Sequence, residues 1–306
     1  MIDYVARRLV QSLFILVGVT LVTFLLLFIV PADPARQIAG RSASPEQVES
    51  VRRELGLDRP FHEQYLRYLG HLIEGDLGRS YLQKSAVSEL IASRLPATLL
   101  LMAGAIFCEL LLGLTMGLLA AIWRNSRLDR ILMIISFIGV SAPQFVVAIL
   151  LLYFLGFYLG WVPLGGYGKF SQLILPSLTL GILGAGWYSR MMRSSMIEVL
   201  RQDYIRTAKA KGLSPATTII IHAIPNAILP VVAMIGIDIG YFMSGIVVVE
   251  SVFGWPGIGQ LAWQAIQHVD IPIIMGVTLI SAIAIVLGNL IADLVAPLID
   301  PRIKIR

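Results

Sequence analysis

The residues best placed to do chemistry in this sequence are acids that interrupt long apolar segments. Glu109 and Asp238 each stand among uncharged, mostly apolar residues. An ionised carboxylate at the centre of a bilayer costs at least about 2.5 kcal/mol on insertion scales, so both acids should face protein or a wet cavity. Gly236 and Gly240 flank Asp238 and would let a backbone or a small molecule approach it closely. We expect Asp238 to meet a cationic group such as an α-amino terminus; the alternative for both acids is a carboxylate satisfied by a neighbouring helix.

A separate polar stretch predicts a helical hairpin between apolar segments. The pattern predicts one helix from Met196 to Lys211, and Gly212 suits the position just past its C-terminus, where φ is often positive. Ser214 and Pro215 predict a second helix, with the hydroxyl as N-cap and the ring at the first position. The cations of the first helix are Arg201, Arg206, Lys209 and Lys211. A cationic hairpin between spans should lie on the cytoplasmic side.

Three interpretations of this hairpin are open from its pattern alone. A DNA-binding helix-turn-helix has a similar outline, but one tethered between two membrane spans would be unusual. A surface-lying linker would place its Lys and Arg side chains against anionic headgroups. A docking element would receive mechanical work from a soluble partner. Periodicity does not decide between the last two.

Composition places the chain among polytopic membrane proteins. Of its 306 residues, 57% are apolar and 14% are charged, and the mean hydropathy is +0.80. The single cysteine, Cys108, lies in an apolar run, which leaves neither a disulfide framework nor a thiolate metal site. We attribute the net charge of +5 to membrane topology rather than to a nucleic-acid partner.

Several segments are long and apolar enough to span a hydrocarbon core of about 30 Å. The six segments are Leu9–Val30, Pro96–Ile122, Ile131–Leu159, Leu173–Ser189, Ala227–Val249 and Ile273–Ala296. In the third, Pro143 predicts a break or kink, which would place Ser141 and Gln144 at a bend that lines a pathway. The predicted fold class is therefore an all-α membrane protein with six transmembrane helices.

The short loops predict the orientation. Arginines precede the first span and follow the second, and residues 190–211 and 302–306 are also basic, whereas the loops 161–172 and 250–270 carry almost no Lys or Arg. The positive-inside rule therefore puts both termini and the hairpin in the cytoplasm. The first span is longer than a typical signal-peptide core, so we expect an uncleaved anchor.

These patterns divide the chain into four parts. Residues 1–30 are an anchor span, and residues 31–95 are a small external helical subdomain with predicted helices from Ser44 to Leu55 and from Phe61 to Ile73. Residues 96–296 are a core of five spans, which includes the hairpin 194–225 and an external loop 250–272, and residues 297–306 are a cytoplasmic tail.

Several motifs along the chain recur together in one family. Arg206-Thr207-Ala208, Gly212 and His222-Ala223-Ile224-Pro225 follow the frame Glu-Ala-Ala, Gly, Ile-x-Leu-Pro, with departures at Arg206, Thr207 and His222. The other motifs, in order, are Leu55–Pro60, Gly75–Ser80, Arg94–Thr98, Val249–Gln260 and Asp300–Ile303. Together they resemble permease subunits of ABC importers of the dipeptide/oligopeptide/nickel family, over nearly the whole chain.

The resemblance implies roles for three sets of residues. It implies ATPase coupling by Tyr204, Arg206, Thr207, Ala208, Lys209, Lys211 and Gly212. It implies an external gate or binding-protein loop at Glu250, Phe253, Trp255, Pro256, Gly257, Gly259 and Asp270. We add Asp238, Glu109, Ser141 and Gln144 as translocation-pathway residues from their types and positions. At position 238 the family more often has a neutral residue such as Gln, so this acid is particular to the chain.

The resemblance also implies partners and a mechanism. A second, homologous permease, two ATPase subunits holding ATP and Mg, and an extracytoplasmic substrate-binding protein would carry a peptide or related small solute across the bacterial cytoplasmic membrane by alternating access. The chain itself shows no Walker A pattern and no metal-ligand spacing, and its histidines are scattered. We therefore expect no catalytic site, no metal and no cofactor on this chain.

Two other function classes are open from the sequence. A self-sufficient secondary transporter would use Glu109, Asp238 and Asp293 as an ion relay, but such folds often contain internal repeats and none is clear here. A non-transporting scaffold would use the hairpin to recruit a cytoplasmic protein. The sequence does not decide among a dipeptide, a longer peptide, a glutathione-like peptide and a metal chelate as cargo, or whether the permease pairs with itself.

Overall fold

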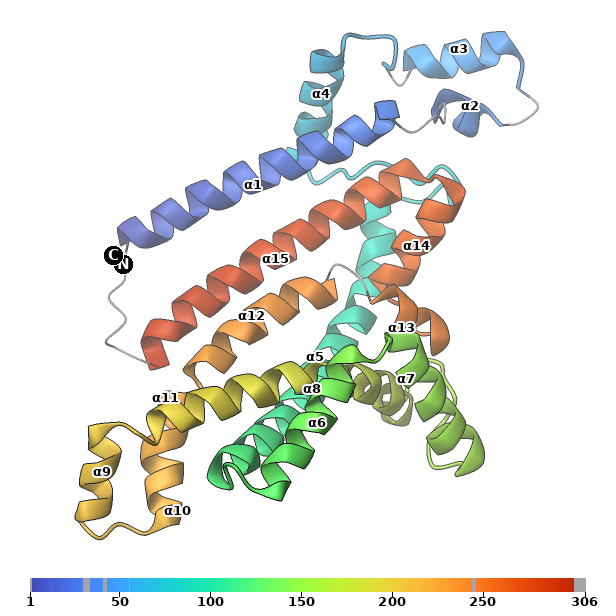
Figure 1. Ribbon diagram of the computed structural model, residues 1–306. Coiled ribbons are helices and arrows are strands. Elements are labelled where there is room, and N and C mark those ends of the chain that lie inside the picture. Colours follow the sequence, from blue (N-terminus) through green and yellow to red (C-terminus); the bar gives the residue numbers. More distant parts are fainter. Residues whose placement is uncertain (1, 30–33, 41–42, 55, 244–245, 300–306) are drawn as a thin grey trace.

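Helices make up nearly all of the described part of the protein. The computed structural model describes residues 2–299 apart from 30–33, 41–42, 55 and 244–245 (Figure 1). Within these residues, the strand-like pairing is a single bridge between Arg79 and Ala86. The predicted all-α class is thus confirmed for this part of the chain.

The helices fall into three groups along the chain. The first group is α1 (Ile2–Ile29), α2 (Pro34–Ala39), α3 (Pro45–Glu54) and α4 (Phe61–Ile73). The second is α5 (Val87–Ile122), α6 (Arg127–Ser141), α7 (Gln144–Leu151), the π-helical η1 (Leu152–Tyr158) and α8 (Phe170–Val199). The third is α9 (Asp203–Ala210), α10 (Pro215–Thr217), the π-helical η2 (Thr218–Ala223), α11 (Ile224–Ala227), α12 (Leu229–Met243), α13 (Val247–Val252), α14 (Ile258–His268) and α15 (Ile271–Ile299). The two helices predicted between spans one and two are α3 and α4.

Three helices, α5, α8 and α15, are each long and apolar enough to cross a membrane unbroken. Two bent pairs raise the number to five if each pair is one span: α6 with α7 and η1, and residues 215–227 with α12. The N-terminal helix α1 contains a shorter apolar stretch, Val10–Leu25. These helices cover the six predicted spans, although the number of crossings stays a prediction.

The predicted third span is not one straight helix. The axes of its two halves differ by 107°, and the break falls at Ala142 and Pro143. Because the Pro143 ring clashes with a helical conformation of the residue before it, Ala142 is extended at ψ 133°. The predicted break at Pro143 is confirmed, and the segment Ile131–Leu159 turns sharply there.

Two helices extend past the ends of the predicted spans. Helix α5 begins at Val87, and Pro96 lies inside it rather than at its start. Its 36 residues correspond to about 54 Å, so it extends well beyond a bilayer core. Helix α8 continues past the predicted end at Ser189 to Val199.

Helices α5 and α8 form the centre of the molecule because glycines let their backbones approach. A Cβ on Gly113 would lie 3.0 Å from the carbonyl oxygen of Ala185, and one on Gly117 would lie 2.5 Å from that of Ser189. The first distance is tighter than nearly all real Cβ contacts, and the second is too short for any side chain. The close approach allows two long helices to bury small residues against each other without gaps.

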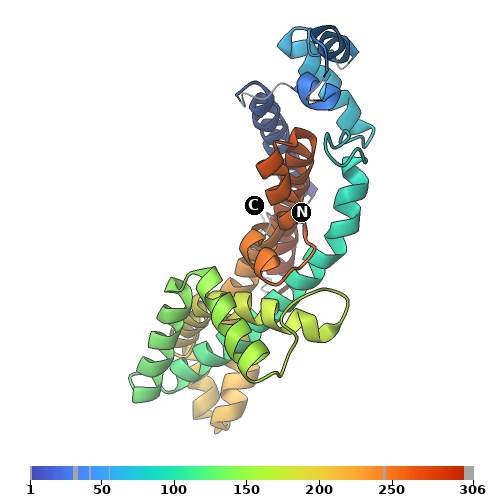
Figure 2. The same ribbon diagram turned by 90° about the vertical axis from the view of Figure 1, so that its right-hand side faces the viewer.

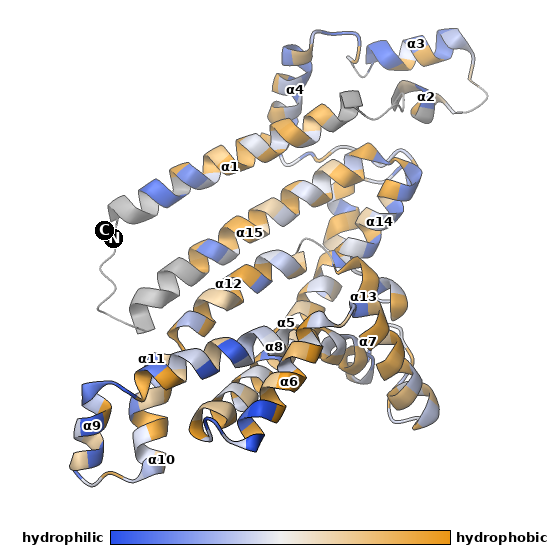
Figure 3. Cartoon of the chain, in the orientation of Figure 1, coloured by the Kyte–Doolittle hydropathy of each residue, from blue (hydrophilic) through white to orange (hydrophobic). Residues whose placement is uncertain are grey.

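The polar ends of the molecule lie at opposite extremes. In both views the subdomain α2–α4 stands at one end and the hairpin α9–α10 at the other (Figures 1 and 2). Hydrophilic residues concentrate in α3, in α9 and in the turn between α5 and α6, while the helices between them are mostly apolar (Figure 3). The subdomain is attached to α1 through Phe24, whose ring stacks on Tyr68 at 5.5 Å between centroids.

Candidate functional site

The predicted hairpin is present, with one correction to its first helix. The segment from Met196 to Lys211 is not one helix, because α8 ends at Val199 and α9 begins at Asp203. Gly212 follows α9 with a φ of +80°, and Ser214 Oγ accepts a hydrogen bond from the Thr217 amide at 3.1 Å. The turn and the cap are therefore the ones that the sequence predicts.

Burial divides the predicted coupling residues into two faces. Ala208 is 7% exposed, and Ile205 is fully buried in a cluster with side chains of α8 and α12. The remaining six are exposed: Tyr204, Arg206, Thr207, Lys209, Lys211 and Gly212. Arg206 also forms a solvent-exposed ion pair with Asp203 at 3.3 Å, which contributes little to stability. The hairpin thus has an apolar face on the core and a cationic face directed outward.

Three of the four predicted pathway residues line one cavity. Glu109, Gln144 and Asp238 face a space of about 440 Å³ whose walls come from α5, the α6–α7 break, α8 and α12. Gln144 Nε2 donates to the Tyr241 hydroxyl at 2.6 Å across this space. Ser141 is exposed beside the break but does not line the cavity. The proline break therefore delivers Gln144, and not Ser141, to the cavity.

The two acids meet across this cavity. The Tyr188 hydroxyl of α8 donates a hydrogen bond to Asp238 Oδ2 on α12, and the Glu109 carboxyl of α5 interacts with Asp238. Glu109 is 4% exposed, and its Oε2 has no hydrogen-bond partner among the described residues. Sequence reasoning missed Tyr188, because one tyrosine in an apolar helix gives no signal of its partner.

The predicted external-loop residues are largely buried and serve as anchors within the chain. Glu250 is fully buried and accepts from the Gln260 amide at 2.7 Å and from the Thr98 hydroxyl at 3.3 Å. Burial raises the pKa of the Glu250 carboxyl, and these hydrogen bonds oppose that shift. Trp255 is also fully buried, and its indole N–H donates to the Ala97 carbonyl at 2.9 Å.

The other residues of the external-loop set follow the same pattern. Phe253, Gly257, Gly259 and Asp270 are buried, and Pro256 is half-buried. Asp270 accepts three hydrogen bonds, from Ser80 Oγ at 2.5 Å and from the amides of Tyr81 and Leu82 at 3.2 Å each. Burial, with the nearby Asp270 charge as a second cause, raises the pKa of Tyr81 to about 12. Their predicted contact with a binding protein stays a prediction.

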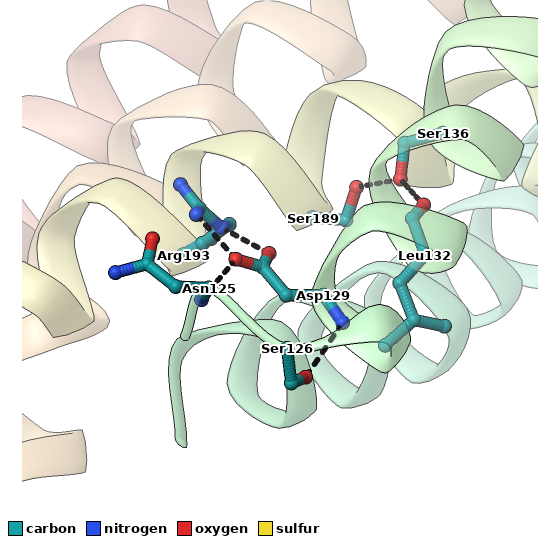
Figure 4. Close-up of polar contacts among 7 residues, drawn as sticks. All are labelled: Asn125, Ser126, Asp129, Leu132, Ser136, Ser189 and Arg193. Carbon is teal, nitrogen blue, oxygen red and sulfur yellow. Dashed lines mark hydrogen bonds and ion pairs between the residues drawn. The ribbon is translucent and has the colours of Figure 1, made fainter. Parts of the chain in front are cut away.

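One further ion pair escaped the sequence reasoning. Arg193 of α8 donates two hydrogen bonds, each of 2.7 Å, to the two carboxylate oxygens of Asp129 at the start of α6 (Figure 4). The hydroxyls of Ser136 and Ser189 join the same two helices at 2.6 Å. These contacts hold α6 against α8. Nothing in the sequence pairs residues 64 positions apart.

Comparison with known proteins identifies the family of the chain. The family model described as "Binding-protein-dependent transport system inner membrane component" matches residues 113–305, and the N-terminal model of such transport systems matches residues 1–102. The chain belongs to this family. It is accordingly a permease subunit of an ABC importer and a multi-pass protein of the inner membrane.

Individual relatives support the same assignment. The "Glutathione transport system permease protein GsiC" of Salmonella paratyphi A is 40% identical over 304 residues, which cover 99% of each chain. GsiC of Escherichia coli K12 is 38% identical over the same share of both chains. An inward-facing MetNI methionine ABC transporter chain aligns with a TM-score of 0.59 at 20% identity, covering 69% of this chain and 97% of that one. That last likeness shows the fold alone.

Proposed function

We propose that this permease moves small peptides, including glutathione-like ones, into the cell. The observation that carries the proposal is the full-length similarity to GsiC, a relative named for glutathione transport. The cavity supports it, because about 440 Å³ lies within the usual range for small-molecule sites, about 300–1,000 Å³. Its mixture of aromatic walls and carboxyl groups suits a short peptide with a charged end.

The proposed assembly contains a second permease, two ATPase subunits and an extracytoplasmic binding protein. ATP and Mg would be held by the ATPase subunits alone. The hairpin supports this arrangement, since its outward face carries Arg206, Lys209 and Lys211 around the exposed ring of Tyr204. A groove with acidic walls and an apolar floor on the ATPase would complement that face.

The proposed topology has six spans with both termini and the hairpin in the cytoplasm. The opposite placement of the subdomain α2–α4 and the hairpin supports it (Figures 1 and 2). The basic residues of the hairpin and of the α5–α6 turn fall at the same end, as the positive-inside rule requires. The subdomain and the loop 250–272 would then face outward.

The mechanism we propose is alternating access driven through the hairpin. The hairpin joins α8 directly to α12, the two helices that supply Tyr188 and Asp238 to the cavity. A push on the hairpin by the closing ATPases would therefore shift these two helices relative to each other. Such a shift would open the cavity toward one side of the membrane and close it toward the other.

The test is transport by the complete assembly. The chain, expressed with its genomic neighbours, is purified as a complex and reconstituted into vesicles that contain the binding protein. We expect vanadate-sensitive ATP hydrolysis and ATP-dependent uptake of a labelled dipeptide or of glutathione. Uptake that needs a proton gradient and no ATP would contradict the proposal.

A further inference from the structure

The cavity between α5, α8 and α12 holds two interacting carboxyl groups and no cationic side chain among its described lining residues. Glu109 and Asp238 both line it, whereas the described lining contains no Lys, Arg or His. The described polar contact to the Asp238 side chain besides Glu109 is the Tyr188 hydroxyl, a neutral donor. A cation entering the cavity would supply a countercharge.

One carboxyl oxygen of Glu109 could accept a hydrogen bond from a ligand. The residue is 96% buried, yet Oε2 has no hydrogen-bond partner among the described residues. Gly184 of α8 makes room for this carboxyl group, because a Cβ at that position would collide with it. A buried, unpartnered carboxylate oxygen is costly, so a donor at this point is favoured.

The walls of the cavity suit an organic cation better than a hydrated metal ion. Trp187, Tyr188 and Tyr241 contribute aromatic rings, and ammonium groups bind favourably over such faces. Trp187 and Tyr241 are 57% and 53% exposed, so the cavity can be reached from the surface of the chain. An ammonium group offers three donors, enough for both carboxyl groups at once.

We propose that this cavity binds the protonated amino group of the transported peptide, with Glu109 and Asp238 as its two carboxyl ligands. Tyr188 positions Asp238, and Gly184 leaves the space that Glu109 occupies. The inference rests on the proposed function, because it assigns a chemical group to the cargo of the same permease. It predicts that the permease cavity binds a peptide with a blocked amino group more weakly than the free peptide. This selection would add to any selection by the binding protein.

A binding measurement tests the inference independently of transport. Leucinamide carries a free ammonium group and no carboxylate. It therefore forms no ion pair with Arg190, the cation that stacks on the Trp187 ring at 4.5 Å. Purified complex without binding protein is titrated with leucinamide while tryptophan fluorescence is recorded, and Trp187→Phe identifies the signal. N-acetyl-leucinamide and sodium chloride of equal ionic strength serve as comparison probes.

The expected result is a saturable signal with leucinamide and none with the other two probes. Glu109→Gln and Asp238→Asn should each weaken leucinamide binding at least about tenfold, since one charge-assisted contact is lost. Glu89→Gln, which removes an exposed acid at the start of α5, should leave it unchanged. Equal responses to leucinamide and its N-acetyl form, equal competition by sodium, or unchanged binding in both acid variants would overturn the inference.

A failure of the proposed function and a failure of this inference would give different experimental results. Wild-type vesicles that take up no peptide would contradict peptide transport, whereas the fluorescence titration would still report on the amino-group site. Conversely, uptake of free and N-acetylated dipeptides at equal rates, with identical rates in both acid variants, would leave the transporter assignment intact and remove this site.

Discussion

Two pairs of acids in this molecule differ in how completely their oxygens are satisfied. Glu250 and Asp270, in the segment between α12 and α15, accept hydrogen bonds from backbone amides and hydroxyls that the chain itself supplies. Glu109 and Asp238 border a cavity and interact with each other; the Tyr188 hydroxyl donates to Asp238, and Glu109 Oε2 has no partner among the described residues. The first pair fixes loops to helices, and the second pair can bind a ligand that enters the cavity.

The difference teaches that burial of an acid is not by itself a sign of function. Hydrogen bonds from several donors offset part of the cost of burying a carboxylate, and removing that carboxylate leaves the donors unpaired, which is strongly destabilising. A carboxylate with an open oxygen costs more to bury and is cheap to neutralise. The two pairs should therefore respond in opposite ways when stability and ligand binding are measured on the same variants.

The largest expected effect on stability is at Asp270. Asp270→Ala leaves Ser80 Oγ and two backbone amides without their acceptor, which should lower the free energy of unfolding by about 3 kcal/mol or more. Thermal unfolding of the purified complex measures this loss. Asp58→Ala, at an exposed acid between α3 and α4, should change stability by less than about 0.5 kcal/mol. A similar small change for Asp270→Ala would contradict its anchoring role.

A smaller, pH-dependent effect is expected at Glu250. Because the pKa of this carboxyl is raised in the folded state, the folded protein holds its proton to higher pH than the unfolded chain does. Its contribution to stability should therefore fall as pH rises from the ordinary value of 4.5 through the raised folded pKa. Comparing the unfolding temperature of wild type and Glu250→Gln across this range should show the difference shifting in favour of the variant. A difference independent of pH would contradict the shift.

The smallest effect on stability is expected at Glu109. Glu109→Gln replaces a buried carboxyl group whose Oε2 makes no described hydrogen bond, so the free energy of unfolding should change by less than about 1 kcal/mol in either direction. The same variant should lose leucinamide binding. Destabilisation as large as that of Asp270→Ala would show that Glu109 is an anchor and would erase the contrast between the two pairs.

The sequence predicted local features well and contacts between distant elements poorly. The helices α3 and α4, the break at Pro143, the turn at Gly212 and the cap at Ser214 all depend on a few neighbouring residues, and all are present. Each follows from the backbone restrictions of proline and glycine or from a hydroxyl cap.

The contacts that the sequence did not predict share a different physical cause. The burial of Asp270, the pairing of Tyr188 with Asp238 and the ion pair of Arg193 with Asp129 all depend on which helix faces meet in space. Hydrophobic periodicity does not encode that choice in a chain whose helices are apolar on nearly every side. The inward hydrogen bonds of the loop residues Glu250 and Asp270 were therefore not predicted, and the contact of this loop with a binding protein stays a prediction.

The coupling role of the hairpin is the central claim of this account, and Gly212 tests it most directly. Its φ of +80° strains a residue with a side chain, while no atom lies within 4 Å of a Cβ placed there, so backbone strain is the effect under test. Left-handed backbone costs an L-residue about 1–2 kcal/mol, most for a β-branched one and least for Asn.

The measurement is ATP-dependent peptide uptake by the reconstituted complex with Gly212→Val and its matched control Gly212→Asn. We predict that the Val variant inserts normally and loses at least about tenfold in uptake per ATP hydrolysed, while the Asn variant keeps most of its coupling. Wild-type uptake in both variants would contradict a coupling role for this turn.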